Sequence, residues 1–219
     1  MTAKLAGISI VVALLLGTPL CRAENMQVEL AIGHQDMTMV LDGGDRMDLE
    51  MHYIDFNYRE RVNPHTGGGV NLGFTDVTVD RDDQALRTMT GQHLRVRWYL
   101  LPWQSRQARS ILDFEYGFER MQDQNTDDLV LQWYQWLLGA GFAYTLSEQF
   151  EFFAGAAIVG FNGKQMPPKQ DITRFKGEKN AVFSAGFIYR FGDGGALGLR
   201  GFYQQQTGAE MFFRHDYNK

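Results

Sequence analysis

Apolar and polar residues alternate along much of the chain, and the clearest example lies between Thr88 and Arg120. The first part alternates aliphatic or aromatic residues with polar ones over residues 93–100. After a polar turn, the alternation resumes over residues 112–119. Because successive side chains of a strand point to opposite faces, each part is predicted to be a strand with one apolar face and one charged face.

These two strands are predicted to form a hairpin folded about Ser105. In that register Arg97 lies opposite Asp113, and Arg95 lies opposite Glu115. Opposite charges on facing strand positions stabilise a sheet. The pattern therefore predicts a ladder of opposite charges on a single face of the hairpin.

The same period-two pattern predicts further strands, each bounded by turn-forming residues. They cover residues 27–35, 47–59, 69–79, 130–145, 150–161, 181–191 and 197–206. In the strand over residues 47–59 the apolar set changes phase, and we interpret this change as a β-bulge near Tyr53. Bacterial single-chain barrels have even strand numbers, so residues 210–218 are predicted to form a tenth strand. The alternative is eight strands that close at Phe191, whose segment 187–191 resembles a closing strand.

The connections fall into two alternating sets. One set is polar and often long, and it covers residues 38–46, 80–87, 121–129 and 163–179. The other set includes the tight turns 146–149 and 192–196. Outer-membrane barrels have long outer loops and short periplasmic turns, so the first strand is predicted to start in the periplasm.

Aromatic residues gather near both ends of the predicted strands, as expected for girdles at two membrane interfaces. The predicted periplasmic girdle contains Trp98, Trp103, Tyr144, Phe150, Tyr189 and Phe191. The predicted outer girdle contains Phe118, Trp133 and Phe161.

Residues 1–23 have the layout of a cleaved secretory signal peptide. Lys4 precedes the 13-residue apolar run 5–17, and Cys21-Arg22-Ala23 ends the segment. This run is too short for a comfortable transmembrane helix. Cleavage after Ala23 would leave a chain without cysteine and a single domain over residues 24–219.

Composition separates a membrane barrel from a soluble β-sandwich. The chain has 24 glycines, 13% aromatic residues and a formal net charge of −5, with no basic run that would favour nucleic acid. Its apolar faces carry large aromatics, whereas the opposite faces carry charges of both signs. We therefore predict an all-β, antiparallel transmembrane barrel of 8–10 strands, with ten preferred, in a bacterial outer membrane. Its inward charges are predicted to form a network that fills the interior, comprising Arg95, Arg97, Asp113, Glu115, Glu119, Arg190 and Arg200.

The pattern over residues 24–208 resembles the small outer-membrane barrels represented by OmpA, OmpX and related porin-like proteins. This resemblance implies contact with outer-membrane lipid and lipopolysaccharide, and insertion by the barrel-assembly machinery. It implies no cofactor. The role it favours is structural, adhesive or interacting, and a small pore is an alternative.

A second resemblance covers residues 152–208, which look like the last third of outer-membrane lipid A deacylases. That family carries a His-x-Ser-Asn motif in which His is the base and Ser the nucleophile. Here Tyr203 stands in place of the His and Gln205 in place of the Ser. A lipid-A-modifying enzyme is therefore an alternative only if other residues perform the chemistry, and no catalytic residue is assigned.

Other candidate chemistry is sparse. The acidic pairs at 82–83 and 127–128, with His215-Asp216, resemble rim residues of omptin proteases or weak Ca²⁺ ligands, although such pairs are usually solvated charge. The five histidines are scattered and show no metal-binding spacing: His34, His52, His65, His93 and His215. No metal site is predicted.

Overall fold

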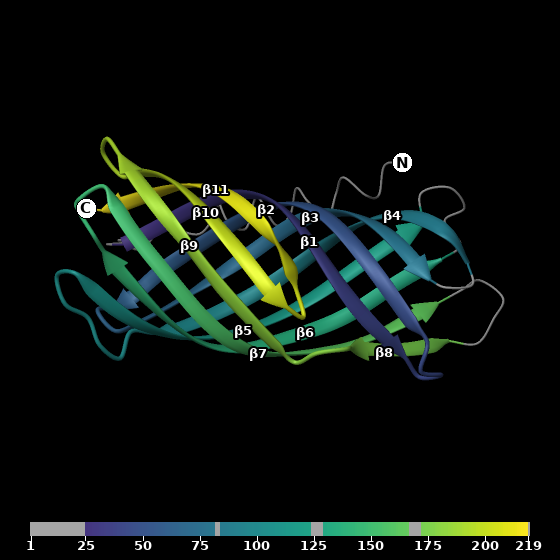
Figure 1. Ribbon diagram of the computed structural model, residues 1–219. Helices are drawn as coiled ribbons and strands as arrows, with labels where there is room; N and C mark the ends of the chain where they lie inside the picture. Colours follow the sequence, from purple (N-terminus) through teal and green to yellow (C-terminus); the bar gives the residue numbers. More distant parts are fainter. Residues whose placement is uncertain (1–24, 82–83, 124–128, 167–171, 219) are drawn as a thin grey trace.

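The computed structural model describes residues 25–81, 84–123, 129–166 and 172–218, and these residues form antiparallel strands joined by turns (Figure 1). Among them there is no helix long and apolar enough to cross a membrane. The predicted signal peptide lies outside the described residues. The strands are β1 (Asn25–Leu41), β2 (Arg46–Asn63), β3 (Thr66–Arg81), β4 (Gln84–Leu100), β5 (Ala108–Asp123), β6 (Val130–Thr145), β7 (Phe150–Met166), β8 (Thr173–Gly177), β9 (Ala181–Phe191), β10 (Gly195–Gln204) and β11 (Thr207–Asn218).

The first and last strands close the barrel. β1 pairs with β11 in a continuous antiparallel register from Asn25 opposite Asn218 to Asp36 opposite Thr207. The strand predicted over residues 210–218 is therefore confirmed, and closure at Phe191 is wrong. We call the half of the barrel that holds residues 25 and 218 the terminal half, and the opposite half the distal half.

The two halves are rings of different size. In the terminal half the ring runs through β1 to β7 and then β9, β10 and β11. These last three strands are short, and the β10–β11 turn lies partway along the wall (Figure 1). Beyond that level β8 replaces them, because it pairs with β7 at residues 162–165 and with β1 at residues 39–41. The described strands thus form a ten-stranded ring that becomes an eight-stranded ring. The loop predicted over residues 163–179 was wrong, since it contains the end of β7 and all of β8.

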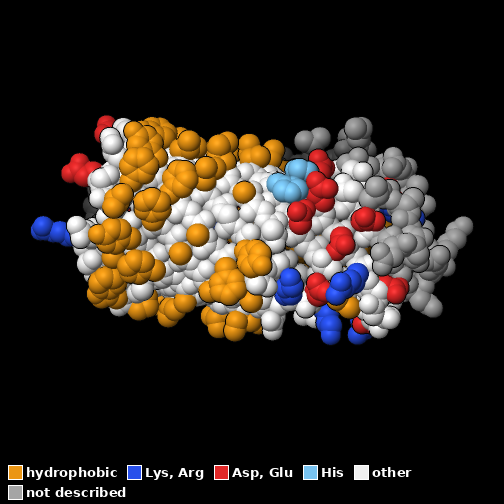
Figure 2. Space-filling view, in the orientation of Figure 1, with side chains coloured by type: hydrophobic (Ala, Val, Ile, Leu, Met, Phe, Trp, Pro, Cys, Tyr) orange, Lys and Arg blue, Asp and Glu red, His pale blue; other side chains and the backbone are white. Residues whose placement is uncertain are grey.

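The terminal half carries a belt of apolar side chains on its outer surface (Figure 2). Phe114 is 40% exposed and Leu138 57% exposed, values that would be unfavourable in water. Only a lipid environment covers such a continuous surface. The belt contains Leu30, Ile32, Ile54, Phe56, Phe74, Leu94, Trp98, Leu100, Leu112, Phe114, Tyr116, Tyr134, Trp136, Leu138, Phe142, Phe152, Phe187, Leu197, Leu199 and Phe213.

The distal half has the opposite arrangement, with an apolar interior and a polar outer surface. Its interior is a close-packed cluster rich in methionine, which we call the distal core. The interior of an eight-stranded barrel is just wide enough for side chains to fill. The change from ten strands to eight therefore explains why the distal core is close-packed. The distal core contains Met37, Met39, Leu41, Met47, Leu49, Met51, Val77, Val79, Met89, Met121, Leu129, Leu131, Trp133, Val159, Phe161, Phe175 and Val182.

The predicted β-bulge near Tyr53 does not exist. Tyr53 is opposite Gly33 on one side and Thr75 on the other, and both registers continue without a shift at this level. The apolar residues change face because the surroundings change. Ile54 points outward into the belt, whereas Met51 points inward into the distal core.

This change also explains why the predicted loops were too long. Residues 38–41 belong to β1 and residues 84–87 to β4, although both stretches were assigned to polar connections. In β1, Met39 and Leu41 point inward and pack in the distal core, whereas the polar Thr38 lies on the outer face. The polar composition therefore marks a water-facing strand and not a loop.

The aromatic girdles are partly as predicted. The six residues assigned to the periplasmic girdle are all between 36% and 53% exposed on the terminal half. In the outer girdle, Phe118 lies on the outer surface and contacts the ring of Tyr134. Trp133 and Phe161 were assigned wrongly, because they are 0% and 3% exposed inside the distal core.

Candidate functional site: the charged interior of the terminal half

The β4–β5 hairpin places its charges inside the barrel, in a register that is shifted by two residues from the predicted one. Arg97 lies opposite Glu115, and Arg95 lies opposite Gly117. The turn is therefore centred after Ser105 and not on it. Arginine is long enough to reach diagonally, so Arg97 still forms its ion pair with Asp113.

Arg95 makes a second diagonal pair in the same hairpin. Its Nη2 atom lies 2.7 Å from Oε1 of Glu119, and its Nε atom lies 4.0 Å from Oε1 of Glu115. Gln135 on β6 donates a hydrogen bond to Glu115 over 3.3 Å. The charges of β4 and β5 are therefore linked to the next strand in the ring.

A second cluster forms where the barrel closes. Glu29 on β1 is 1% exposed and accepts hydrogen bonds from the Nε and Nη2 atoms of Arg214 on β11, at 3.1 and 2.9 Å. Arg59 on β2 lies 3.6 Å from the other carboxylate oxygen. One buried carboxylate thus bridges two arginines across the β1–β11 closure, which offsets the cost of burying these charges.

A second buried carboxylate bridges two arginines on the other side of the ring. Glu151 on β7 is 1% exposed and lies 2.6 Å from Arg109 on β5 and 2.9 Å from Arg190 on β9. Between the two clusters, Arg200 pairs with Glu210 at 3.2 Å. These contacts connect strands that are distant in the sequence.

The boundary between the charged interior and the distal core holds a chain of three polar side chains. His93 Nε2 lies 3.0 Å from Asp55, and His93 Nδ1 lies 3.2 Å from the hydroxyl of Thr75. Thr75, His93 and Asp55 thus follow one another in the same order as the nucleophile, base and carboxylate of a catalytic triad. Thr75 and His93 are each only 4% exposed, and neither lines the interior cavity described next. Their geometry therefore supports a buried polar contact and not an exposed nucleophile.

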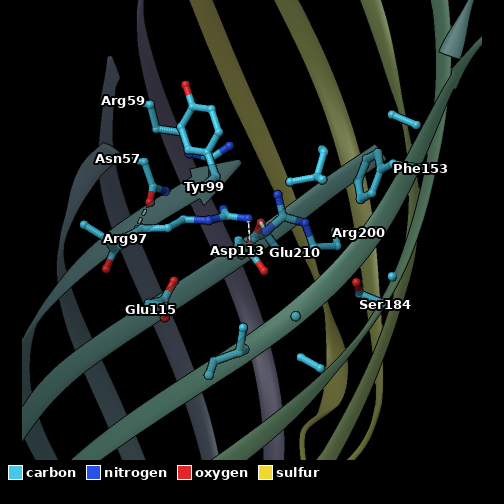
Figure 3. A pocket seen from close by; sticks show the side chains of 18 of the residues that line it. Asn57, Arg59, Arg97, Tyr99, Asp113, Glu115, Phe153, Ser184, Arg200 and Glu210 are labelled. Carbon is cyan, nitrogen blue, oxygen red and sulfur yellow. Dashed lines mark hydrogen bonds and ion pairs between the residues drawn. The ribbon is translucent and has the colours of Figure 1, made fainter. Parts of the chain in front are cut away.

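The charges surround a cavity of 620 Å³ in the terminal half. Figure 3 shows Arg97 and Arg200 reaching into it from different sides toward Asp113 and Glu210. The side formed by β6, β7 and β9 is lined by small residues that leave space, namely Gly139, Gly141, Gly155, Ala156, Ala157 and Ser184. The small residues therefore leave open space on the β6, β7 and β9 side, next to the Glu151–Arg190 ion pair.

All seven residues predicted to form the interior network lie on the inner face of the terminal half, and each has an ion-pair partner. The sequence interpretation missed the residues that complete the clusters. Their signal was present, since each is a charge at an inward position of a strand. The missed residues are Glu29, Asp55, Arg59, Arg109, Glu151, Glu210 and Arg214.

The positions that match the deacylase motif are not arranged for acyl transfer. Tyr203 points outward and is 62% exposed, whereas Gln205 is 2% exposed in the β10–β11 turn. The Gln205 side chain donates a hydrogen bond to the Thr38 carbonyl over 3.0 Å and accepts one from the Lys179 amide. Gln205 thus fixes the place where the ring changes from ten strands to eight. The two acidic pairs lie outside the described residues, and His215-Asp216 lies at the terminal end of β11.

Comparison with known proteins reveals a shared fold. No protein-family model matches the chain, and no curated protein matches its sequence. The translocator domain of autotransporter NalP from Neisseria meningitidis aligns with a TM-score of 0.50 and 12% identity, over 100% of this chain and 97% of that one. The outer membrane protease OmpT from Escherichia coli aligns with a TM-score of 0.52 and 11% identity, over 90% and 98%. The beta domain of the Bordetella autotransporter BrkA gives 0.50 and 11%, over 90% and 100%.

These likenesses concern the barrel and not its chemistry. One of the three is described as an outer membrane protease, and the other two as domains of autotransporters. Together with the lipid-facing belt, they support a single location for this chain. It is a β-barrel of the bacterial outer membrane.

Proposed function

We propose that the protein is a non-conducting barrel whose distal half stands above the membrane and provides a surface for interaction. The observation that carries this proposal is the distal core, which fills the lumen across the eight-stranded ring. An ion passing along the axis would have to cross a close-packed layer that includes Trp133, Leu131 and Met39, each 0% exposed.

The outer surface of the distal half supports the interaction role. Its strands continue beyond the apolar belt and carry acidic side chains outward, including Asp48, Asp76 and Asp80. A charged surface of this kind belongs in water and beside lipid headgroups. We propose that lipopolysaccharide surrounds this level, and that the barrel-assembly machinery inserts the chain.

Planar-bilayer recording tests the non-conducting part. We expect the purified protein to give no discrete conductance steps. A variant with Trp133→Ala, Phe161→Ala and Phe175→Ala loses three large side chains of the distal core, and it should conduct if it still assembles. Trp136→Ala changes an outward residue of β6, the strand that also holds Trp133, and this variant should give no conductance steps. Discrete steps from the unaltered protein would overturn the proposal.

Cysteine labelling on intact cells tests the orientation. Thr78→Cys places a thiol on the outer surface of the distal half, and Glu148→Cys places one in the turn between β6 and β7 at the terminal end. A membrane-impermeant maleimide should label the first variant and not the second. Labelling of the second variant alone would show that the distal half faces the periplasm.

A further inference from the structure

Two histidines face each other on the outer surface, just beyond the apolar belt. His34 on β1 and His52 on β2 are directly opposite in the strand register, and their ring centroids are 4.8 Å apart. The next outward pair toward the terminal end is Ile32 opposite Ile54, which belongs to the belt. Figure 2 shows histidine side chains at the edge of the belt with acidic side chains beside them.

Two carboxylates occupy the next outward pair in the distal direction. Asp36 is opposite Glu50, so the four side chains form a square on adjoining strands. His34 Nε2 lies 3.5 Å from Asp36 Oδ1, and His52 Nε2 lies 3.5 Å from Glu50 Oε1. Donor atoms of His34, His52 and Glu50 all lie within 4.8 Å of one another. Among the described residues no other such group of three is present.

The two histidines and the two carboxylates do not satisfy one another's hydrogen-bonding capacity. A distance of 3.5 Å is longer than the roughly 2.7–3.2 Å of a good N–H···O hydrogen bond. The Nδ1 atom of His34 is shielded from solvent and has no hydrogen-bond partner in the described part of the chain. Two imidazoles and two carboxylates therefore converge with unused ligand capacity.

The site is also accessible. The side chains of His52 and Glu50 are 64% and 54% exposed. Asp36 and Glu50 line an outer groove of 490 Å³ beside the β10–β11 turn. An ion can therefore reach His52 and Glu50 from water without any rearrangement of the strands.

We propose that His34, His52 and Glu50 bind a first-row transition-metal dication of the Zn²⁺ type. Imidazole nitrogen with one carboxylate oxygen suits Zn²⁺, whereas Ca²⁺ and Mg²⁺ prefer ligand sets made of oxygen alone. Three protein ligands leave one position of a tetrahedral ion open to solvent. Asp36 is a positioning residue, because its carboxylate lies beside Nε2 of His34 and restrains the orientation of that ring.

Titration calorimetry with Zn²⁺ tests the site on the full-length mature protein in detergent, purified without a histidine tag and treated with a chelator beforehand. We expect one Zn²⁺ per chain. The double variant His34→Ala/His52→Ala should lose this binding, and Glu50→Gln should weaken it. Asp36→Asn should weaken it by about 10-fold, the usual effect of removing an outer-shell carboxylate. His65→Ala and Glu148→Gln are matched controls in turns at the terminal end, and both should bind as the unaltered protein does.

Two further measurements keep the test decisive. Heat-modifiable migration on a gel confirms that the double variant is still a folded barrel. Co²⁺ bound in place of Zn²⁺ should give visible absorption bands that disappear in the folded double variant. Absence of Zn²⁺ binding would overturn the proposal, as would equal binding by the double variant. Displacement of Zn²⁺ by an equal concentration of Ca²⁺ would show a merely acidic patch and would also overturn it.

Discussion

Strands β1 to β7 run through both halves of the barrel, but the two halves place their apolar residues on opposite faces. Along β2, Met47 and Met51 point inward in the distal half, whereas Ile54 and Phe56 point outward in the terminal half. The alternation of side chains is unbroken between them. The comparison teaches that strand geometry decides only which residues share a face, and that the surrounding medium decides which face is apolar.

The interiors differ in the same way. The terminal half is held by arginine–carboxylate pairs around a cavity, and the distal half is held by close packing of apolar side chains. Each kind of interaction fits its ring. Ten strands leave space for charged side chains and a cavity, and eight strands leave space only for a packed core.

The largest effect is expected from opening the distal core. Trp133→Ala removes the largest fully buried side chain, and a change of this kind costs about 3–5 kcal/mol of unfolding free energy. Trp98→Ala removes a lipid-facing tryptophan that is 53% exposed and should cost clearly less. Urea unfolding of both variants in lipid vesicles measures the difference. Equal losses would mean that the distal core is not close-packed.

A somewhat smaller effect is expected from a charge on the belt. Phe114→Arg should reduce the unfolding free energy by roughly 2–4 kcal/mol if the side chain lies near the middle of the bilayer. Thr90→Arg adds the same charge to the water-facing surface of the distal half on the neighbouring strand β4, where we expect almost no change. The same vesicle assay compares the two. A stable Phe114→Arg protein would show that the belt does not face lipid.

The buried ion pairs of the terminal half should contribute less than either packing or lipid contact. Glu29→Gln keeps the size of the side chain but leaves Arg214 without its carboxylate, at a cost of about 1–3 kcal/mol for an imperfectly satisfied buried group. Because the partners lie on β1 and β11, the loss should appear as faster exchange of the amide hydrogens of these two strands. If the amide hydrogens of β1 and β11 exchange as slowly as in the unaltered protein, the Glu29–Arg214 pair does not contribute to barrel closure.

The smallest effect is expected at the surface of the distal half. Arg46 on β2 pairs with Glu178, just after β8, at 2.5 Å, but the Arg46 side chain is 67% exposed. Exposed ion pairs contribute about 0–1 kcal/mol. Arg46→Ala should therefore leave the unfolding midpoint nearly unchanged. A large shift would indicate that β8 depends on this contact for its place in the ring.

Alternation in the sequence was sufficient to predict the ten strands of the terminal half and the faces of the β4–β5 hairpin, because Leu94 to Leu100 keep one environment throughout. It failed at Tyr53, where the environment changes and the register does not. Trp133 and Phe161 were misplaced for the same reason, since a strand pattern does not tell whether an aromatic faces lipid or a protein core.

Two other features depended on contacts that a local pattern does not contain. β8 has only five residues, and it is a strand because β7 and β1 lie on either side of it. The bond between Glu29 and Arg214 joins residues near the two ends of the chain, and it exists only once β1 and β11 have paired. Five of the seven predicted interior charges pair within the β4–β5 hairpin, whereas Arg190 and Arg200 find their partners, Glu151 and Glu210, on other strands.

The change from ten strands to eight has a consequence for the order of events in assembly. The described strands of the distal ring end at Gly177, so the chain up to that point holds every strand of that ring, although Val182 of β9 also packs in the distal core. The terminal ring cannot close until β11 has been synthesised, because Asn25 pairs with Asn218. Both closures join segments far apart in the sequence, which is the slowest kind of contact to form. The distal end of the barrel is therefore closed by β8, which precedes in the chain the strand β11 that closes the membrane-embedded end.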